Sequence, residues 1–272
     1  MNEILAGPGI AAGSPLDAAV SQRDRDTMRM VNAAVQAGDV ILVYQPVVQA
    51  GTPDRLAFFE GLVRVLDRTG RVIPARDFID VVETHETGRI LDCLALERGL
   101  AILARDPDLR LSINMSARSI GYKRWTETLE QGLSRMPTLA NRLILEITEA
   151  SAMVIPDIVQ VFMKDLHQRG ITFALDDFGA GFTSFRYLKS FEFDILKIDG
   201  QFIKDIHAES DNQVMVQALV AIAQQFEMFT VAEAVETARD AAFLSAVGVD
   251  CLQGYYYGAP KRLPDKGLIS AR

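Results

Sequence analysis

The sequence predicts an α/β fold, a (β/α)8 TIM-like barrel modified by an antiparallel first strand. The chain has 272 residues, 49% hydrophobic and 24% charged, which suits a single barrel, a fold of about 250 residues. Short apolar runs alternate with amphipathic segments, the pattern of parallel strands joined by crossover helices. Only about ten residues separate the first two runs, too few for a crossover helix, so these strands are expected to pair antiparallel.

Residues 1–24 are interpreted as a flexible leader and residues 25–272 as the barrel domain, which opens with a helix over Arg25–Ala37. The first strand is predicted over Val40–Tyr44, where Gln45 and Pro46 end it. The remaining strands are predicted over residues 56–60, 109–113, 143–145, 171–175, 195–196, 229–232 and 249–252.

Apolar residues three and four positions apart predict the helices between these strands. The first such helix is expected to bury Cys93, Leu96, Leu100 and Leu103. Pro156 opens another, whose buried stripe is predicted to be Ile158, Val161, Phe162 and Leu166. A later helix is predicted to bury Met215, Leu219, Ile222 and Phe226, and a last one runs through Phe243 and Leu244.

Each of the eight apolar runs ends on a polar or charged residue. Because parallel strands end together at one end of a barrel, these side chains are expected to form a ring there. Taken alone, such a residue is a helix cap in roughly nine cases of ten, but Glu and Lys are poor caps. The ring consists of Gln45, Glu60, Asn114, Glu146, Asp176 with Asp177, Lys197, Glu233 and Gln253.

Oxygen ligands without His or Cys point to Mg²⁺ or Mn²⁺, and a doubled Asp suggests two ions that share a bridging carboxylate. Two such ions can clamp a phosphoryl displacement and generate a nucleophilic water near neutral pH. Adjacent strand residues point to opposite faces, so Asp176 and Asp177 can both reach the site only where the backbone turns.

Composition excludes other classes of function. A net charge of −8 argues against binding polymeric nucleic acid or inserting into an anionic membrane surface. Cys93 and Cys251 lie in apolar segments without zinc-type spacing, as core residues of a reducing compartment do. The sequence has neither a membrane-spanning stretch nor a secretory signal, so we expect a cytoplasmic protein.

The ordered motifs of the chain resemble those of the EAL-domain cyclic di-GMP phosphodiesterase family, over roughly residues 39–264. They are YQPVV from Tyr44, FEGLVR from Phe59, NMS from Asn114, LEITE from Leu145, DDFGAGFTSF from Asp176, LKID from Leu196, AEAVET from Ala232 and QGY from Gln253. The resemblance implies a barrel with an antiparallel first strand.

The same resemblance implies roles for individual residues. One metal ion would be held by Glu60, Asn114, Glu146 and bridging Asp176, and the second by Asp176, Asp177 and Glu233. Glu233 would also accept the proton of the attacking water, Lys197 would hold that water or a phosphate oxygen, and Gln253 would position Glu233 or the water. Gln45 corresponds to a guanine-contacting position and Arg64 to a phosphate-contacting one. Without these motifs, Arg64 and Lys197 would be read as surface ion pairs.

Glu149 matches a family position that holds the loop Phe178–Ser184. Because that loop and the following helix commonly take part in the family's dimer contact, the resemblance implies a homodimer whose assembly is coupled to metal binding through Glu149. Ala234 departs from the family pattern, in which Gly follows the Glu at position 233. If this residue takes a positive φ, a Cβ there costs about 1 kcal/mol and can misplace Glu233.

The favoured function is hydrolysis of cyclic di-GMP to linear pGpG by in-line attack of a metal-activated water, with two Mg²⁺ or Mn²⁺ ions. The alternative is a catalytically weak or inactive cyclic di-GMP receptor. A third hypothesis, an Mg²⁺-dependent barrel enzyme that forms an enolate, needs a Lys or His base across the site, and only Lys197 is available. The complete ligand set favours the hydrolase, because buried like charges are costly in a protein that binds no cations.

Overall fold

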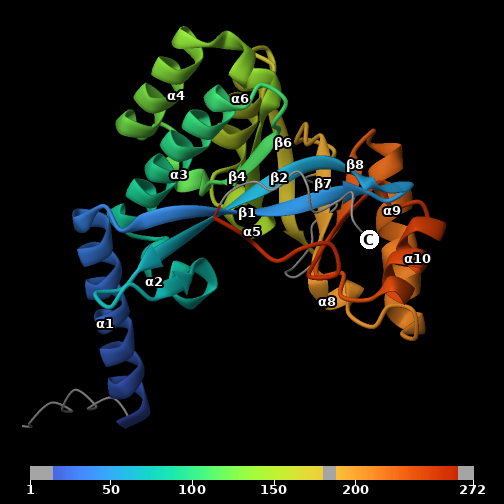
Figure 1. The fold of residues 1–272 in the computed structure, drawn as a ribbon, viewed down its shortest axis with the longest axis horizontal. Coiled ribbons are helices and arrows are strands. Elements are labelled where there is room, and N and C mark those ends of the chain that lie inside the picture. The colour runs from blue at the N-terminus through green and yellow to red at the C-terminus, as the bar shows by residue number, and fades with distance from the viewer. Residues whose placement is uncertain (1–14, 180–187, 263–272) are drawn as a thin grey trace, which may run out of the picture.

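A computed structural model describes residues 15–179 and 188–262 of the chain. Within these ranges one nine-stranded sheet has the order β1-β9-β8-β7-β6-β5-β4-β2-β3, and an additional β1–β2 pairing closes eight of the strands into a barrel. β3 lies outside the ring, antiparallel to β2. The predicted α/β barrel is therefore confirmed (Figure 1).

The strands are β1 (Val40–Gln49), β2 (Thr52–Leu66), β3 (Val72–Pro74), β4 (Leu111–Asn114), β5 (Leu143–Thr148), β6 (Thr172–Phe178), β7 (Ile195–Ile198), β8 (Phe229–Ala232) and β9 (Cys251–Gln253). The helices are α1 (Pro15–Ala37), α2 (Ile79–Val82), α3 (Glu86–Arg105), α4 (Lys123–Arg135), α5 (Glu149–Ala152), α6 (Pro156–His167), α8 (Gly200–Ile203), α9 (Ser210–Gln225) and α10 (Ala238–Ala246), with short 3₁₀ turns at Ala75–Asp77, Ala117–Ser119 and Pro137–Arg142.

β1 and β2 form a long antiparallel hairpin, which confirms the predicted direction of the first strand. Both strands are longer than predicted, and the prediction that Gln45 and Pro46 end β1 is wrong, because β1 continues to Gln49. Proline is tolerated at position 46 because the ladder to β9 begins only at Val47, so the missing N–H breaks no bond to that strand.

α1 begins at Pro15, ten residues before the predicted start at Arg25, so residues 15–24 of the expected flexible leader are helical. Figure 1 shows this helix projecting from the barrel. Its residues 17–26 are exposed, whereas Val31 and Ala34 near its end are buried in a small core with Phe78 and Val82. The early turns bury no apolar stripe, which is why the sequence pattern did not reveal them.

Two predicted helix faces are only partly right: Leu166 and Leu219 are buried as predicted, and Phe162 and Ile222 pack partly buried against the core, but the other predicted residues are exposed. In α6, Val159, Met163 and Leu166 are buried, while Ile158 and Val161 are 53% and 71% exposed. In α9, Leu219 is buried as predicted, but Met215 and Phe226 are exposed, and Val216, Val220 and Ala223 take their place. Each helix carries two overlapping apolar stripes, and periodicity alone does not say which one faces the sheet.

The inside of the barrel is filled by one side chain from each of six strands: Val47, Phe58, Ile144, Ala174, Ile195 and Val231. Because alternate residues of a strand share a face, the residues two positions along also point into the barrel. On β2, β5, β6 and β7 these are Glu60, Glu146, Asp176 and Lys197. The six apolar residues therefore form a buried layer directly below the polar residues, which we call the apolar floor.

Candidate metal and substrate site

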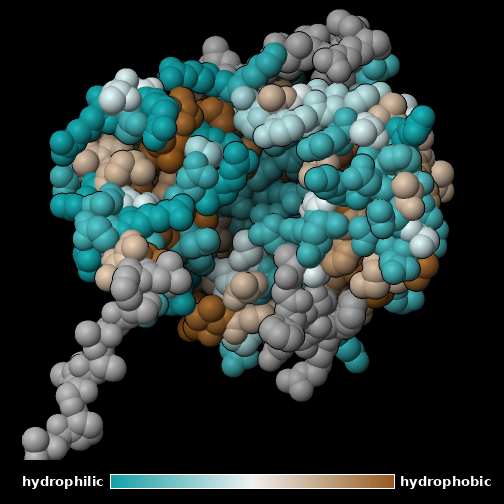
Figure 2. Space-filling model, turned by 90° about the horizontal axis from the view of Figure 1, so that it is seen from below, coloured by the Kyte–Doolittle hydropathy of each residue, from teal (hydrophilic) through white to brown (hydrophobic). Residues whose placement is uncertain are grey.

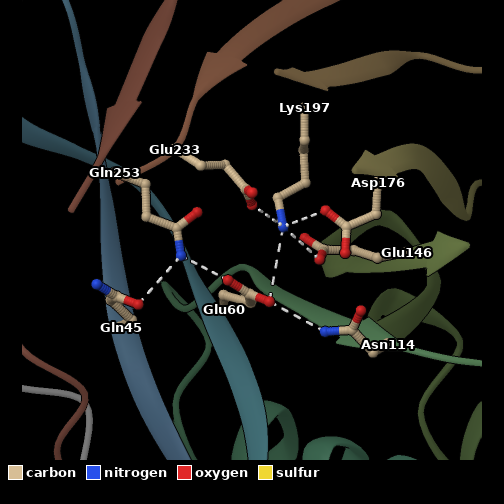
Figure 3. A network of polar contacts seen from close by, with 8 residues as sticks. All are labelled: Gln45, Glu60, Asn114, Glu146, Asp176, Lys197, Glu233 and Gln253. Carbon is tan, nitrogen blue, oxygen red and sulfur yellow. Dashed lines mark hydrogen bonds and ion pairs between the residues drawn. The ribbon is translucent and has the colours of Figure 1, made fainter. Parts of the chain in front are cut away.

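Lys197 stands at the centre of the polar layer, with its side chain only 1% exposed. Its Nζ lies 2.7 Å from Glu233 Oε1, 2.8 Å from Glu146 Oε2, 2.8 Å from Asp176 Oδ1 and 3.6 Å from Glu60 Oε1. Figure 3 shows the four carboxylates converging on it from different strands. One ammonium group thus links β2, β5, β6 and the end of β8.

Two amide side chains hold Glu60 from either side. Asn114 Nδ2 donates a hydrogen bond to Glu60 Oε1 at 3.0 Å, and Gln253 Nε2 donates one to Glu60 Oε2. Gln253 also donates to Gln45 Oε1 at 3.4 Å, and Gln45 donates to the Gly258 carbonyl at 3.1 Å. Gln253 was expected to position Glu233 or the water, but the contacts it makes here are to Glu60 and Gln45 (Figure 3).

Asp176, Asp177 and Glu233 each offer an oxygen, and these oxygens all lie within 4.8 Å of one another. The backbone turn that brings both aspartates to the site is present. Asp177 has a φ of 55°, and the β6–β7 register shifts between Leu175 and Phe178. A left-handed residue at such an irregularity swings its side chain out of the strand alternation.

The cluster contains more carboxyl groups than cationic groups, and burial together with this excess raises the pKa of several of its carboxyl groups. Burial, with repulsion from Glu60 and Asp176, raises the pKa of Glu146 well above its usual value. Asp177 is exposed, yet partial desolvation and the neighbouring Asp176 raise its pKa to about 6. For Glu233, burial outweighs the attraction of Lys197 and raises the pKa to about 8. Five carboxyl groups around one ammonium are not all stable as anions without further positive charge.

Glu60 and Lys197 keep their charges. Burial opposes ionisation of Glu60, but Lys197 and the hydrogen bonds from Gln253 and Asn114 outweigh it and lower its pKa. Burial likewise opposes the charge on Lys197, yet Asp176, Glu146 and Glu233 raise its pKa well above the usual value. Lys197 is therefore a buried cation within the site rather than part of a surface ion pair.

The donor set fits divalent cations. Glu146 Oε1 is buried and has no hydrogen-bond partner, and Asp176, Asp177 and Glu233 could ligate one ion. These are hard oxygen donors without His or Cys, as Mg²⁺ and Mn²⁺ prefer. A dication here would relieve the charge excess.

A cavity of about 660 Å³ opens beside the cluster, lined by Asn114 and Asp177 together with polar residues of α2, α3 and α5. α8, which follows β7, lies at the lower end of the barrel in Figure 1, and Figure 2 views the molecule from that side. The view shows a hollow lined mainly by hydrophilic residues. The site is thus accessible from the face at which the parallel strands end.

Sequence reasoning missed Asp92, which lines this cavity from α3. It accepts hydrogen bonds from Ser116 N at 3.0 Å and Ser119 Oγ at 2.6 Å. Burial raises its pKa to about 7. Its position four residues before Leu96, on the apolar face of the predicted helix, was a signal in the sequence that could have identified it.

The other predicted positions lie around the cluster. Arg64 is half-buried on β2, four residues beyond Glu60 and on the same face of the strand. Its Nη1 donates to the Val63 carbonyl at 2.8 Å. Glu149 is a buried residue at the start of α5. Most of the loop 178–184 that it was expected to hold lies outside the described residues. Ala234 has a φ of 52°, so the condition under which its Cβ is costly is met.

The fold and the site define an α/β barrel protein with a carboxylate centre suited to divalent cations. A profile of the EAL domain matches residues 28–260, and the chain belongs to this family. It is 29% identical over 248 residues to cyclic di-GMP phosphodiesterase PdeF of Escherichia coli, covering 89% of this chain and 33% of that protein. It is 29% identical over 258 residues to the bifunctional diguanylate cyclase/cyclic di-GMP phosphodiesterase MucR of Pseudomonas aeruginosa, covering 92% and 37%. The chain thus spans about a third of the length of these curated relatives.

The chain also matches solved structures of EAL proteins in fold. A MucR phosphodiesterase in complex with c-di-GMP matches with a TM-score of 0.75 and 28% identity, covering 87% of this chain and 97% of that chain. An EAL domain protein of Listeria monocytogenes matches with a TM-score of 0.75 and 26% identity, covering 86% and 94%. Among the described residues, none of the helices combines the length and the apolar character needed to cross a membrane.

Proposed function

We propose that this chain hydrolyses cyclic di-GMP to linear pGpG with the help of two Mg²⁺ or Mn²⁺ ions. The observation that carries the proposal is the complete cluster around Lys197, in which four buried or partly buried carboxylates lie within 3.6 Å of one ammonium nitrogen. Relatives named as cyclic di-GMP phosphodiesterases support the choice of substrate.

Glu60, Asn114, Glu146 and Asp176 would hold one ion, and Asp176, Asp177 and Glu233 the other. When bound, the ions would lower the pKa of a water molecule and neutralise charge on the phosphate. Asn114 and Glu60 are adjacent, joined by a 3.0 Å hydrogen bond, which supports assigning both residues to one ion.

The chain's own residues supply the remaining chemistry. Glu233 lies at the edge of the cluster, where its carboxylate can accept a proton from an attacking water. Lys197 stabilises negative charge that grows on the phosphate oxygens as the attack proceeds. Gln253 keeps Glu60 in place, while Gln45 and the guanidinium fork of Arg64 bind the dinucleotide through a base and a phosphate.

A receptor that binds cyclic di-GMP without cleaving it is the second candidate. The observation that favours it is the left-handed backbone of Ala234, directly after Glu233. If strain there displaces Glu233, the ligand binds but no proton is accepted.

For either candidate function, we also propose that the chain forms a homodimer and that Glu149 couples dimerisation to metal binding. Glu149→Ala should then weaken Mn²⁺ binding and dimerisation together without unfolding the chain.

The test is turnover of cyclic di-GMP by the purified chain in Mn²⁺, with product separated by chromatography. Hydrolysis is expected to give pGpG and to stop on addition of a chelator. Glu60→Gln, which keeps size but removes charge, should abolish it. Metal-dependent binding of intact cyclic di-GMP without product selects the receptor, and failure to bind cyclic di-GMP contradicts both candidates.

A further inference from the structure

Ala234 is held in an unusual backbone conformation by its neighbours. Its φ of 52° lies in the left-handed region, where a Cβ approaches the following carbonyl oxygen. On one side, Glu233 N–H donates to the Ile198 carbonyl at 3.2 Å, and on the other, Val235 N–H donates to the Gln253 carbonyl at 2.9 Å. The backbone is thus fixed on both sides of the Ala234 methyl group.

That methyl group faces Gly200. A Cβ built on Gly200 would lie 2.7 Å from Ala234 Cβ, a distance that two carbon atoms do not reach without displacement. Both Cβ atoms are attached directly to backbone, so rotation of a side chain cannot relieve the overlap. One of the two positions can therefore carry a methyl group here, but not both.

The contact joins the two strand ends that carry the central ion pair. Gly200 begins α8, three residues after Lys197 on β7, and Ala234 follows Glu233 at the end of β8. Lys197 Nζ and Glu233 Oε1 are 2.7 Å apart. A displacement at Gly200 would therefore reach Glu233 through a single residue.

We propose that Gly200 is a positioning residue, whose missing side chain makes room for Ala234 and keeps Glu233 aligned with Asp176 and Asp177 for a divalent cation. The inference rests on the proposed function for the role of that cation. Helix propensity alone predicts no loss on Gly200→Ala, since Ala is a better helix former than Gly at the start of α8. Weaker Mn²⁺ binding by Gly200→Ala therefore supports the steric contact with Ala234 over an explanation from helix propensity.

The experiment is a double-mutant cycle of the wild type, Gly200→Ala, Ala234→Gly and the double variant. Mn²⁺ affinity of the metal-free chain is measured by titration calorimetry, with circular dichroism to check the fold. Gly200→Ala should weaken Mn²⁺ binding about tenfold or more in the wild-type background, and less than about threefold in the Ala234→Gly background. In turnover, kcat should fall with KM unchanged, because alignment rather than substrate binding is lost.

Gly51→Ala is the matched control. Gly51 lies in the turn after β1 and has no atom within 4 Å of an added Cβ. The antiparallel pairing of Gln49 with Cys251 places this turn at the opposite end of the barrel from Gln253. Gly51→Ala should therefore leave Mn²⁺ affinity unchanged.

Equal losses from Gly200→Ala in the two backgrounds would overturn the coupling, as would an unchanged Mn²⁺ affinity. If Gly200→Ala does not fold, the double variant decides: recovery of the fold supports the steric contact, and an unfolded double variant contradicts it. A wild type that binds Mn²⁺ but does not cleave cyclic di-GMP overturns the proposed function alone. A wild type that binds no Mn²⁺ overturns both.

Discussion

Lys197 Nζ lies 2.7 Å from Glu233 Oε1, so the buried lysine of β7 is paired with the carboxylate that directly follows β8. The same nitrogen contacts Glu146 and Asp176 at 2.8 Å. Because these carboxylates come from distant parts of the sequence, the ammonium group balances charges that the fold itself has brought together. Removing it should affect both stability and chemistry.

Lys197→Met tests this role, since it keeps the length of the side chain and removes the charge. The free energy of unfolding of the metal-free chain should fall by about 3 kcal/mol, the scale for breaking a buried ion pair. Turnover should fall about 100-fold or more at saturating Mn²⁺. Lys123→Met is the control, because Lys123 is 88% exposed and pairs with a surface glutamate. Wild-type turnover by Lys197→Met would contradict the account.

Asp176→Asn tests the bridging position. The substitution is nearly isosteric but removes one charge from the cluster, so Mn²⁺ affinity should fall about tenfold or more. Titration calorimetry on the metal-free protein measures it. Asp211→Asn, at an exposed position of α9, should bind Mn²⁺ as the wild type does. Unchanged affinity in Asp176→Asn would exclude this residue as a ligand.

Arg64→Lys tests substrate binding separately from metal binding. Lysine keeps the charge but loses the planar fork that fits two phosphate oxygens. KM for cyclic di-GMP should rise about tenfold, while Mn²⁺ affinity stays the same. Arg76→Lys, at a side chain that is 79% exposed, provides the control. A fall in kcat without a rise in KM would argue against a binding role.

Asp92 predicts a dependence of stability on pH. Burial raises its pKa in the folded protein to about 7, against a usual value of 3.8. The stabilisation linked to this group is therefore fully present below pH 3.8 and is lost as the pH rises through 7. The unfolded chain releases the proton first, so the folded state is disfavoured in that window.

Asp92→Asn should flatten this profile, because the amide oxygen can still accept from Ser116 N and Ser119 Oγ but carries no charge. We expect the variant to be more stable than the wild type at pH 8 by roughly 1 kcal/mol, and this gain in stability to be smaller at pH 5. Urea unfolding across this range measures the difference. An identical pH profile in the two proteins would show that Asp92 does not titrate there.

The barrel was predictable because its strands are short apolar runs that lead directly into polar residues. Phe58 and Glu60 show why: they share the inner face of β2, one in the apolar floor and the other in the ion-pair cluster. The same spacing places Ile144 below Glu146 and Ile195 below Lys197. The family resemblance then assigned roles that spacing alone could not.

Other features depend on tertiary contacts that the sequence does not display. Pro46 was taken to end β1, but its missing N–H faces no partner in β9, so the strand continues. Ile158 and Val161 looked like a buried stripe, yet the alternative stripe of α6 packs on the sheet. The positioning role proposed for Gly200 depends on its contact with Ala234, which is distant in the sequence.

Anomalous diffraction from crystals of the chain grown with Mn²⁺ tests the central claim most directly. The account predicts two Mn²⁺ peaks beside Lys197, one among Glu60, Asn114, Glu146 and Asp176, and the other among Asp176, Asp177 and Glu233. Crystals at saturating Mn²⁺ with no peak within ligand distance of these carboxylates would contradict it.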